Sequence, residues 1–202
     1  MKLYYSPGAC SMASHMVLNE MGIKFDLEQV TLSTHTTKSG SDYYKINPKG
    51  YVPALTMSNG ELLTEVSVVL QYLADQKPEI NLIPKAGTLE RYRCQEWLTF
   101  VSTELHKNFS PLFRETTPEE TRTSIKNTLA KRFELLTTHL KTNHFLMGAQ
   151  YTVADAYLFT ILRWSHHLKV DLTPYPALMG YVERVKARPA TMVTLKNEGL
   201  LK

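Results

Sequence analysis

KLYYSPGACSMASHMVLNEMG, residues 2–22, switches its hydrophobic pattern within a few positions and decides the fold. Residues 2–5 predict a short strand, and the Ser-Pro-Gly that follows predicts a turn. Residues 10–21 predict a helix, which Gly22 ends because glycine tolerates the left-handed conformation found just beyond a helix. Residues 24–32 predict a second strand. A strand, a helix and a strand in this order form a βαβ unit, whose strands run parallel.

A second stretch, NPKGYVPALTMSNGELLTEVSVVLQYLAD at residues 47–75, completes this domain. Asn59 and Gly60 lie between two short apolar runs, which predicts a hairpin closed by a type I′ turn. Pro53 begins the third strand, where its missing N–H is tolerated, and is a candidate for a cis peptide bond. Residues 65–75 predict a helix, because apolar residues recur there every three or four positions.

The rest of the chain keeps a helical period. Apolar residues spaced by three or four predict helices over 94–105, 125–140, 153–168 and 176–187. The third of these is apolar nearly all round, which predicts burial, and Thr152 with Asp155 predicts a capping box at its start. We therefore expect a thioredoxin-like α/β domain over residues 1–77, a polar linker over 78–87 and an all-helical domain over 88–202.

Composition excludes several classes of function. The 202 residues are 43% apolar and 21% charged, as expected of a folded globular protein. The apolar stretches are shorter than the roughly 18 residues of a membrane span, and the first residues lack the apolar segment of a secretion signal. Only two cysteines occur, which favours the cytoplasm. The net charge of +4 is dispersed along the chain, so we expect no nucleic-acid partner.

Cys10 is the most informative residue for chemistry. It follows a strand and a tight turn and opens a helix, where unpaired N–H groups and the helix dipole predict a lowered thiol pKa. The alternative is a small buried core residue. A thioredoxin motif has a second cysteine three positions later, where this chain has Ala13. Disulfide chemistry would therefore need an outside thiol, and glutathione is the natural candidate.

Two other residues, Glu65 and Val52, are candidates for binding a peptide. Glu65 opens a helix, where it either holds the end of a zwitterionic peptide or only balances the helix dipole. Val52 precedes Pro53 in extended conformation, so its backbone can pair with a peptide strand. His106 and Lys107 end a helix, and interaction with the dipole is their simpler explanation. No metal-ligand spacing, phosphate loop or dinucleotide fingerprint occurs, so we expect no metal and no cofactor.

Over both domains the sequence resembles the cytosolic glutathione S-transferases, and specifically their bacterial beta class. The resemblance lies in KLYYSPGACSMASH, NPKGYVPAL, LTEVSVVLQYLAD, EWLTFVSTELHK and YTVADAYLFTILRW. It implies a cis-proline before the third strand, a homodimer, and glutathione bound between the domains. Catalytic roles would fall on Cys10 and His106. Glutathione contacts would fall on Cys10, His35, Val52, Glu65, Val66, Thr99, Thr103, Glu104, His106 and Lys107, with Glu104 offered by the other subunit.

Two positions depart from the family pattern, since His35 replaces a common lysine and Thr99 a common asparagine. The implied function is a glutathione transferase of detoxification, which conjugates a glutathione thiolate stabilised near Cys10 to small hydrophobic electrophiles. Glutathione is then a co-substrate and not a cofactor. A glutathione-dependent thiol-disulfide oxidoreductase acting through a Cys10 mixed disulfide is the first alternative. A non-catalytic binding protein on the same fold is the second.

Overall fold

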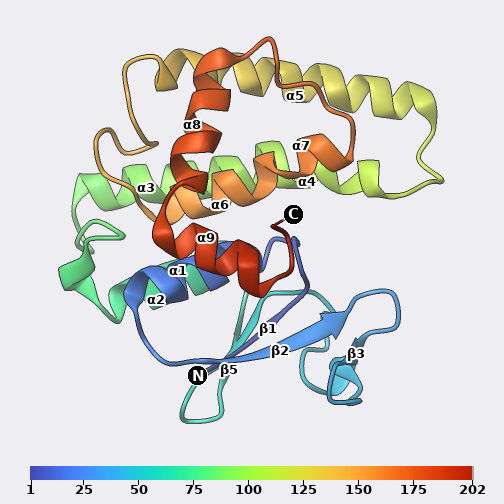
Figure 1. Cartoon of the computed structure of the whole chain (residues 1–202), viewed down its shortest axis with the longest axis vertical. Helices are drawn as coiled ribbons and strands as arrows, with labels where there is room; N and C mark the ends of the chain where they lie inside the picture. Colours follow the sequence, from blue (N-terminus) through green and yellow to red (C-terminus); the bar gives the residue numbers. More distant parts are fainter. Residues whose placement is uncertain (202) are drawn as a thin grey trace. The chain divides into compact units, whose positions relative to one another are not determined.

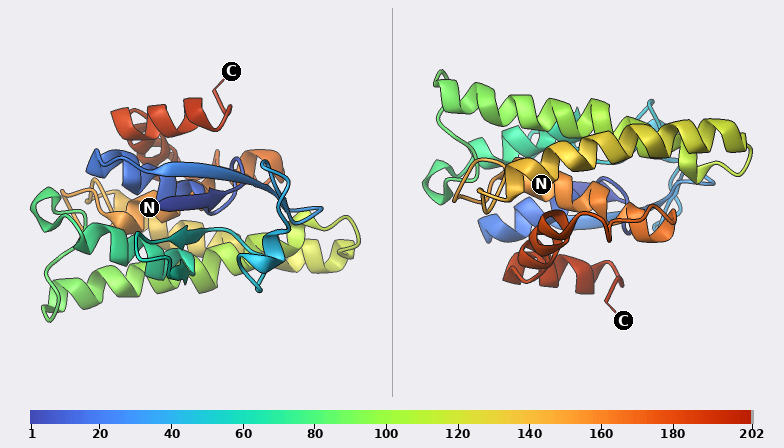
Figure 2. Two further views of the ribbon diagram at one scale, coloured as in Figure 1. Left: turned by 90° about the horizontal axis from the view of Figure 1, so that it is seen from below. Right: turned by 90° about the horizontal axis from the view of Figure 1, so that it is seen from above.

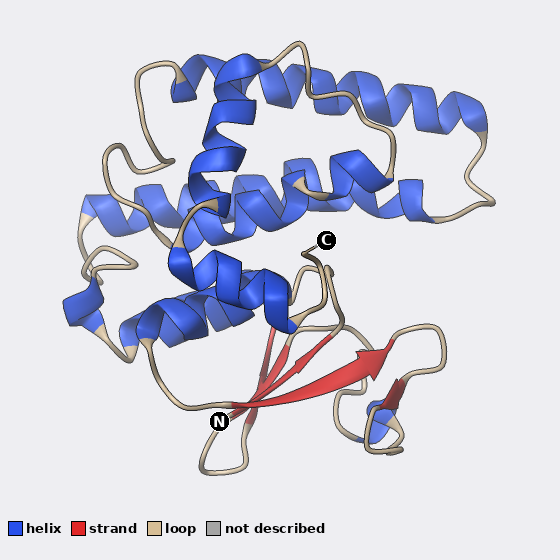
Figure 3. Cartoon of the chain, viewed as in Figure 1, coloured by secondary structure: helices blue, strands red, loops and turns tan. Residues whose placement is uncertain are grey.

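The computed structural model describes residues 1–201, which form two compact units. Unit 1 comprises Met1–Asn81 together with residues 188–201, and unit 2 comprises Leu82–Ala187. The strands of the sheet all belong to unit 1, while unit 2 is helical (Figure 3). This is the thioredoxin-like α/β and all-helical organisation expected from the sequence. The expected helical domain over 88–202 differs at its end, because residues 188–201 pack within unit 1.

Unit 1 is built on a five-stranded mixed sheet with the order β3-β2-β1-β4-β5. The strands are β1 (Lys2–Tyr5), β2 (Asp26–Thr31), β3 (Thr36–Thr37), β4 (Ala54–Thr56) and β5 (Leu62–Thr64). β1 and β2 are parallel, whereas β4 is antiparallel to both β1 and β5. The strands β1, β2 and β5 therefore end at the same side of the sheet. We call this side, beyond Tyr5, Thr31 and Thr64, the carboxyl edge.

The hairpin between β4 and β5 forms as predicted, but its turn is not type I′. Met57 and Glu61 are joined by a backbone hydrogen bond, which leaves a three-residue loop in which Gly60 has a φ of 87°. Asn59 is not in the left-handed region. A three-residue hairpin loop needs only one left-handed residue, and Gly60 supplies it.

The helices of unit 1 are α1 (Met12–Met21), α2 (Val66–Asp75) and α9 (Pro189–Asn197), with 3₁₀ turns at Tyr43–Lys45 and Pro78–Ile80. α1 and α2 pack together on one face of the sheet (Figure 1). Gly22 ends α1 with a φ of 61°, as its position predicted. The last helix predicted from the sequence ends at residue 187, so α9 was not expected. Proline often ends a helix, but Pro189 lies in the first turn of α9, where proline is tolerated. α9 lies beside α1 (Figures 1 and 2).

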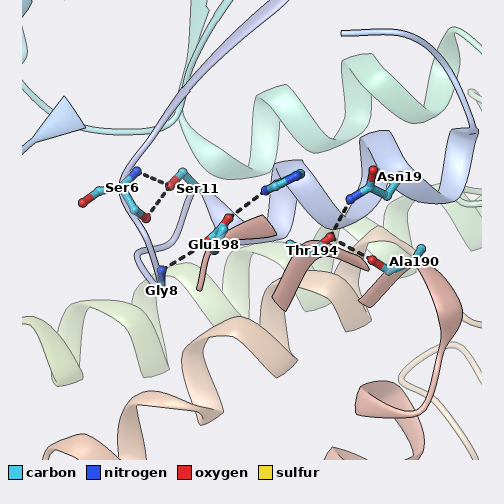
Figure 4. A network of polar contacts seen from close by, with 8 residues as sticks. Ser6, Gly8, Ser11, Asn19, Ala190, Thr194 and Glu198 are labelled. Atoms are coloured by element: carbon cyan, nitrogen blue, oxygen red, sulfur yellow. Dashed lines mark hydrogen bonds and ion pairs between the residues drawn. The ribbon is translucent and has the colours of Figure 1, made fainter. Parts of the chain in front are cut away.

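The end of the chain anchors the turn that precedes Cys10 (Figure 4). Glu198 follows α9, and its side chain is fully buried together with that of His15 on α1. One carboxylate oxygen lies 2.8 Å from Nδ1 of His15, and the other accepts the backbone N–H of Gly8 at 2.8 Å. The turn between β1 and α1 is thus held by a residue that lies 190 positions later in the chain.

Unit 2 consists of α3 (Leu89–Phe100), α4 (Lys107–Phe109), α5 (Glu119–Leu140), α6 (Val153–Leu162), α7 (Trp164–His167) and α8 (Pro176–Lys186). α6 is buried along its whole length and starts with the predicted capping box. A π-helical segment, Val101–His106, joins α3 to α4, and a 3₁₀ turn, Ser110–Phe113, follows. The helix expected to end near Lys107 therefore continues to Phe113.

Candidate functional site

The predicted site residues of unit 1 gather at the carboxyl edge. Cys10 follows β1, and Glu65 follows β5, which runs parallel to β1 because both are antiparallel to β4. Val52 precedes β4, so it lies at the same edge. His35 lies in the turn after β2. Strand direction alone brings these distant parts of the sequence together.

Cys10 is partly buried and lies two residues before Met12, the first residue of α1, so the helix predicted over residues 10–21 begins two residues later. Its Sγ donates a hydrogen bond to the carbonyl oxygen of Val52 at 3.1 Å. Burial raises the pKa of the Cys10 thiol to about 12, although the backbone N–H groups of Cys10 and Ser11 act in the opposite direction. The lowered pKa predicted from the start of the helix is therefore wrong. Loss of hydration destabilises the thiolate more than the two N–H groups stabilise it.

The chain around Val52 is held by hydrogen bonds to its neighbour. The carbonyl of Tyr51 accepts from the Tyr43 hydroxyl at 2.9 Å and from Asn47 Nδ2 at 2.7 Å. The peptide bond between Val52 and Pro53 is cis. These features present the Val52 backbone to the carboxyl edge, where its carbonyl already meets Cys10.

Glu65 immediately precedes α2 and has a φ of 70°, which residues with a side chain rarely adopt. Its carboxylate is paired with Lys49, whose Nζ lies 2.7 Å from Oε1 and also donates to Thr64 Oγ1 at 3.1 Å. Val66 begins α2 with a buried side chain, so its backbone is the part that can meet a ligand. Sequence reasoning missed Lys49, although it lies within the NPKGYVPAL motif.

His35 is held against Tyr44. The two rings are stacked with their centroids 4.4 Å apart, and His35 has a φ of 51°. Gly50 passes close to both rings, since a Cβ there would lie 2.7 Å from Tyr44 Cε1 and 3.0 Å from His35 Cδ2. The imidazole therefore has less freedom than the lysine expected from the family pattern.

The predicted residues of unit 2 all lie on the stretch from α3 to α4. Thr99 lies near the end of α3, and its carbonyl accepts a hydrogen bond from Thr103 Oγ1 at 3.0 Å. Both threonines and Lys107 are exposed. Thr103 lies within the π-helical segment, a wider turn that occurs frequently at functional sites.

Glu104 is held by a cation that the sequence did not reveal. Arg132 on α5 approaches the Glu104 carboxylate with Nη2 at 2.7 Å and Nε at 2.8 Å. The two residues are 28 positions apart, so no local pattern connects them. The Glu104 carboxylate is therefore paired with the Arg132 guanidinium group, which fixes its orientation within unit 2.

His106 is oriented by two aromatic residues of unit 2. Its Nδ1 lies 2.6 Å from the hydroxyl of Tyr157 on α6, and its ring meets Trp164 edge-to-face with centroids 5.0 Å apart. Trp164 also contacts the ring of Phe113, which is 47% exposed. Sequence reasoning placed His106 in the site but did not find Tyr157, which is 51 positions away.

Within residues 1–201, no group of three or more His, Cys, Asp or Glu side chains is arranged to hold a metal ion. None of the helices described there combines the length and apolar character that crossing a lipid bilayer requires.

Comparison with known proteins gives consistent matches along the chain. The model named "Glutathione S-transferase, N-terminal domain" matches residues 8–76, and "Glutathione S-transferase, C-terminal domain" matches residues 100–189. Glutathione S-transferase GstA of Escherichia coli O157:H7 is 44% identical over 200 residues, covering 99% of this chain and 100% of that protein. The bacterial beta class glutathione S-transferase of Sphingomonas chungbukensis is 42% identical with a TM-score of 0.96, and a sphingomonad glutathione S-transferase complexed with glutathione is 40% identical with a TM-score of 0.96. Each of these two matches covers 100% of both chains.

Proposed function

Since the chain belongs to the glutathione S-transferase family, we propose that it binds glutathione at the carboxyl edge of unit 1 and joins it, through a new bond at the glutathione sulfur, to a hydrophobic electrophile. The hydrogen bond from Cys10 Sγ to Val52 O carries the proposal, because it puts a thiol donor beside a backbone suited to pair with a peptide. Glutathione acts here as a co-substrate, and no metal or separate cofactor takes part.

Glutathione would lie extended along the carboxyl edge. The backbone of Val52 pairs with its cysteinyl residue, and the Glu65 carboxylate binds the γ-glutamyl ammonium group. The first turn of α2 has N–H groups without partners inside the helix, so the N–H of Val66 suits the γ-glutamyl carboxylate. His35 makes a further contact, whose reach is limited by its stacking on Tyr44.

Cys10 acts in this proposal as a neutral hydrogen-bond donor. With a pKa of about 12 it keeps its proton at pH 7, so the S–H group can turn from Val52 O to the glutathione sulfur. A donated hydrogen bond favours the glutathione thiolate over its thiol. One donated hydrogen bond increases the thiolate fraction by roughly three- to tenfold, and orientation of the reactants supplies most of the acceleration.

Unit 2 contributes the remaining contacts. Thr99, Thr103 and Lys107 bind glutathione, and the exposed charge of Lys107 suits a carboxylate. His106 assists catalysis with a ring that Tyr157 orients. Glu104 is offered to the glutathione of the other subunit.

The second substrate is a small hydrophobic electrophile. Support comes from the aromatic surface of Phe113, which lies edge-to-face with Trp164 and is 47% exposed. The cellular task we propose is detoxification in the cytoplasm.

The active form is proposed to be a homodimer. Leu89 and Tyr92 of α3 are 66% and 60% exposed, and Leu135 of α5 lines an open groove of about 550 Å³ together with Trp97. Large exposed apolar side chains on neighbouring helices suit burial against a second copy of the chain. Sedimentation equilibrium should give twice the chain mass of 23.1 kDa, and a single-chain mass at all concentrations would exclude the dimer.

Glutathione-dependent consumption of chlorodinitrobenzene by the purified chain is the direct test of the proposed function. We expect turnover above the uncatalysed background. Absence of turnover would shift the assignment to a binding protein or to a thiol-disulfide oxidoreductase.

The Cys10→Ala variant separates conjugation from disulfide chemistry. It should lose no more than the roughly three- to tenfold of conjugation activity that one donated hydrogen bond supplies, but it should lose any glutathione-dependent disulfide reduction completely. Cys94→Ala is the matched control, because Cys94 is a buried thiol on α3. Equal loss of both activities in Cys10→Ala would contradict this division of roles, in which Cys10 assists conjugation but is essential for disulfide reduction.

A further inference from the structure

An exposed ion pair between Lys49 and Glu65 lies at the carboxyl edge, beside the proposed glutathione site. Nζ of Lys49 lies 2.7 Å from Oε1 of Glu65, while the side chains are 53% and 65% exposed. An exposed pair of this kind contributes little to folding stability. The two charged groups can therefore pair with a ligand instead of with each other, without weakening the fold.

Backbone conformation presents both residues at the carboxyl edge. Lys49 precedes Gly50, whose φ of 72° and missing side chain let the chain pass close to the Tyr44 ring. Glu65 has a φ of 70°, and strain of this type persists where the surrounding structure or a ligand site requires it. Neither charged group is placed by helix or strand propensity.

The charge arrangement matches the γ-glutamyl end of glutathione. This end carries an ammonium group and a carboxylate on the same carbon atom. An ammonium group that binds Glu65 must enter beside the like charge of Lys49, which opposes binding unless Lys49 gains a new partner. The carboxylate on the same carbon supplies that partner.

We propose that Lys49 is a glutathione-recognition residue, which exchanges Glu65 for the α-carboxylate of the γ-glutamyl group. The inference rests on the proposed function and adds a specificity determinant to it. In the bound state the charges of Lys49, the ligand carboxylate, the ligand ammonium and Glu65 alternate in sign. A ligand that lacks either charge leaves one of the two protein groups unpaired and therefore binds more weakly.

Titration calorimetry with S-methylglutathione tests this role, because the blocked sulfur separates binding from chemistry. Lys49→Gln should raise Kd by about tenfold, as loss of one charged hydrogen bond does. Lys49→Arg keeps the charge and should restore most of the affinity. Lys24→Gln is the matched control, since this exposed lysine precedes β2 at the opposite edge of the sheet, and its Kd should stay within about twofold of the unaltered chain.

A ligand with a missing charge makes the comparison specific. S-methylglutathione whose α-carboxylate is converted to a carboxamide should bind the unaltered chain about tenfold more weakly than the parent ligand does. In Lys49→Gln, the same change of ligand should raise Kd by less than about threefold. If the carboxamide raises Kd by the same factor in the unaltered chain and in Lys49→Gln, the role of Lys49 is overturned. The same follows if Lys49→Gln binds S-methylglutathione as tightly as the unaltered chain does, or more tightly. Failure of the unaltered chain to bind S-methylglutathione would instead overturn the glutathione site itself.

Discussion

At Cys10, burial and hydrogen bonding act on the same sulfur atom. The buried thiolate would lose hydration, so the pKa rises to about 12, and the nearby negative charge of Glu65 adds to the rise. The neutral thiol, in contrast, satisfies the carbonyl of Val52 at 3.1 Å. A neutral S–H can donate to a second sulfur, which a thiolate cannot do.

Alkylation kinetics test the protonation state of Cys10. In a Cys94→Ala background, native Cys10 should react with iodoacetamide at pH 8 at least about tenfold more slowly than the same thiol in urea, since only thiolate reacts. The folded pKa of about 12 lies above the ordinary value of 9.0, so the stability contributed by neutral Cys10 is present below pH 9 and is lost as pH rises toward 12. Mass spectrometry follows the reaction, and a native thiol that titrates below pH 9 would contradict the prediction.

Tyr157 tests how His106 is oriented. Tyr157→Phe removes the hydroxyl that lies 2.6 Å from Nδ1 of His106, with little change in packing. We expect kcat for chlorodinitrobenzene to fall about three- to tenfold, because a less ordered ring is less often in position. Tyr72→Phe, at a half-buried position near the middle of α2, is the control and should leave kcat unchanged. If His106→Ala lowers turnover but Tyr157→Phe does not, orientation by Tyr157 is excluded.

Among the elements, α6 depends most clearly on one side chain. Asp155 accepts from the N–H groups of Thr152 and Leu146, both at 2.8 Å, and from the Tyr181 hydroxyl at 3.1 Å. Burial raises the pKa of Asp155 to about 6, despite these donors. One carboxyl group thus links the start of α6 to the preceding loop and to α8.

Asp155→Ala should lower the free energy of unfolding by about 2–4 kcal/mol, because it leaves buried N–H groups without an acceptor. The folded pKa of about 6 exceeds the ordinary 3.8, so the part of the stability that comes from protonated Asp155 is fully present below pH 3.8 and is lost as pH rises through 6. The difference from the unaltered chain should therefore be larger at pH 5 than at pH 7. Urea unfolding measures this difference, with Asp26→Ala, at an exposed position, as a control that should change little.

At the scale of the whole molecule, both ends of the described chain contribute to unit 1. Glu198 contacts His15 and Gly8, and Arg188 pairs with Glu20 on α1 at 2.6 Å. These contacts tie residues 188–201 to the turn that precedes Cys10. The carboxyl-terminal segment is therefore part of the structure that positions the sulfur of Cys10.

Glu198→Ala should lower the free energy of unfolding by about 3–5 kcal/mol, because it leaves His15 buried without its partner. It should also alter conjugation kinetics, since the Gly8 N–H loses its acceptor next to the Cys10 turn. Urea unfolding and chlorodinitrobenzene turnover provide the two measurements. Glu79→Ala, at an exposed position, is the control, and equal stability of the two variants would refute the anchoring role of Glu198.

The sequence predicted those parts of the fold that depend on neighbouring residues. The glycine that ends α1 and the capping box of α6 each depend on a few neighbouring positions, and the βαβ unit follows from consecutive segments between Lys2 and Thr31. The residues that sequence reasoning missed have distant partners instead. Lys49, Arg132 and Tyr157 meet Glu65, Glu104 and His106 across 16, 28 and 51 positions.

The sequence by itself determined the two kinds of domain, the order of most elements and the residue types available for chemistry. Only the tertiary structure decided the protonation state of Cys10, the partners of the charged site residues and the membership of residues 188–201 in unit 1. The physical reason is that periodicity and turn chemistry act over one or two helical turns. Burial and ion pairing depend instead on which distant segments the fold brings into contact.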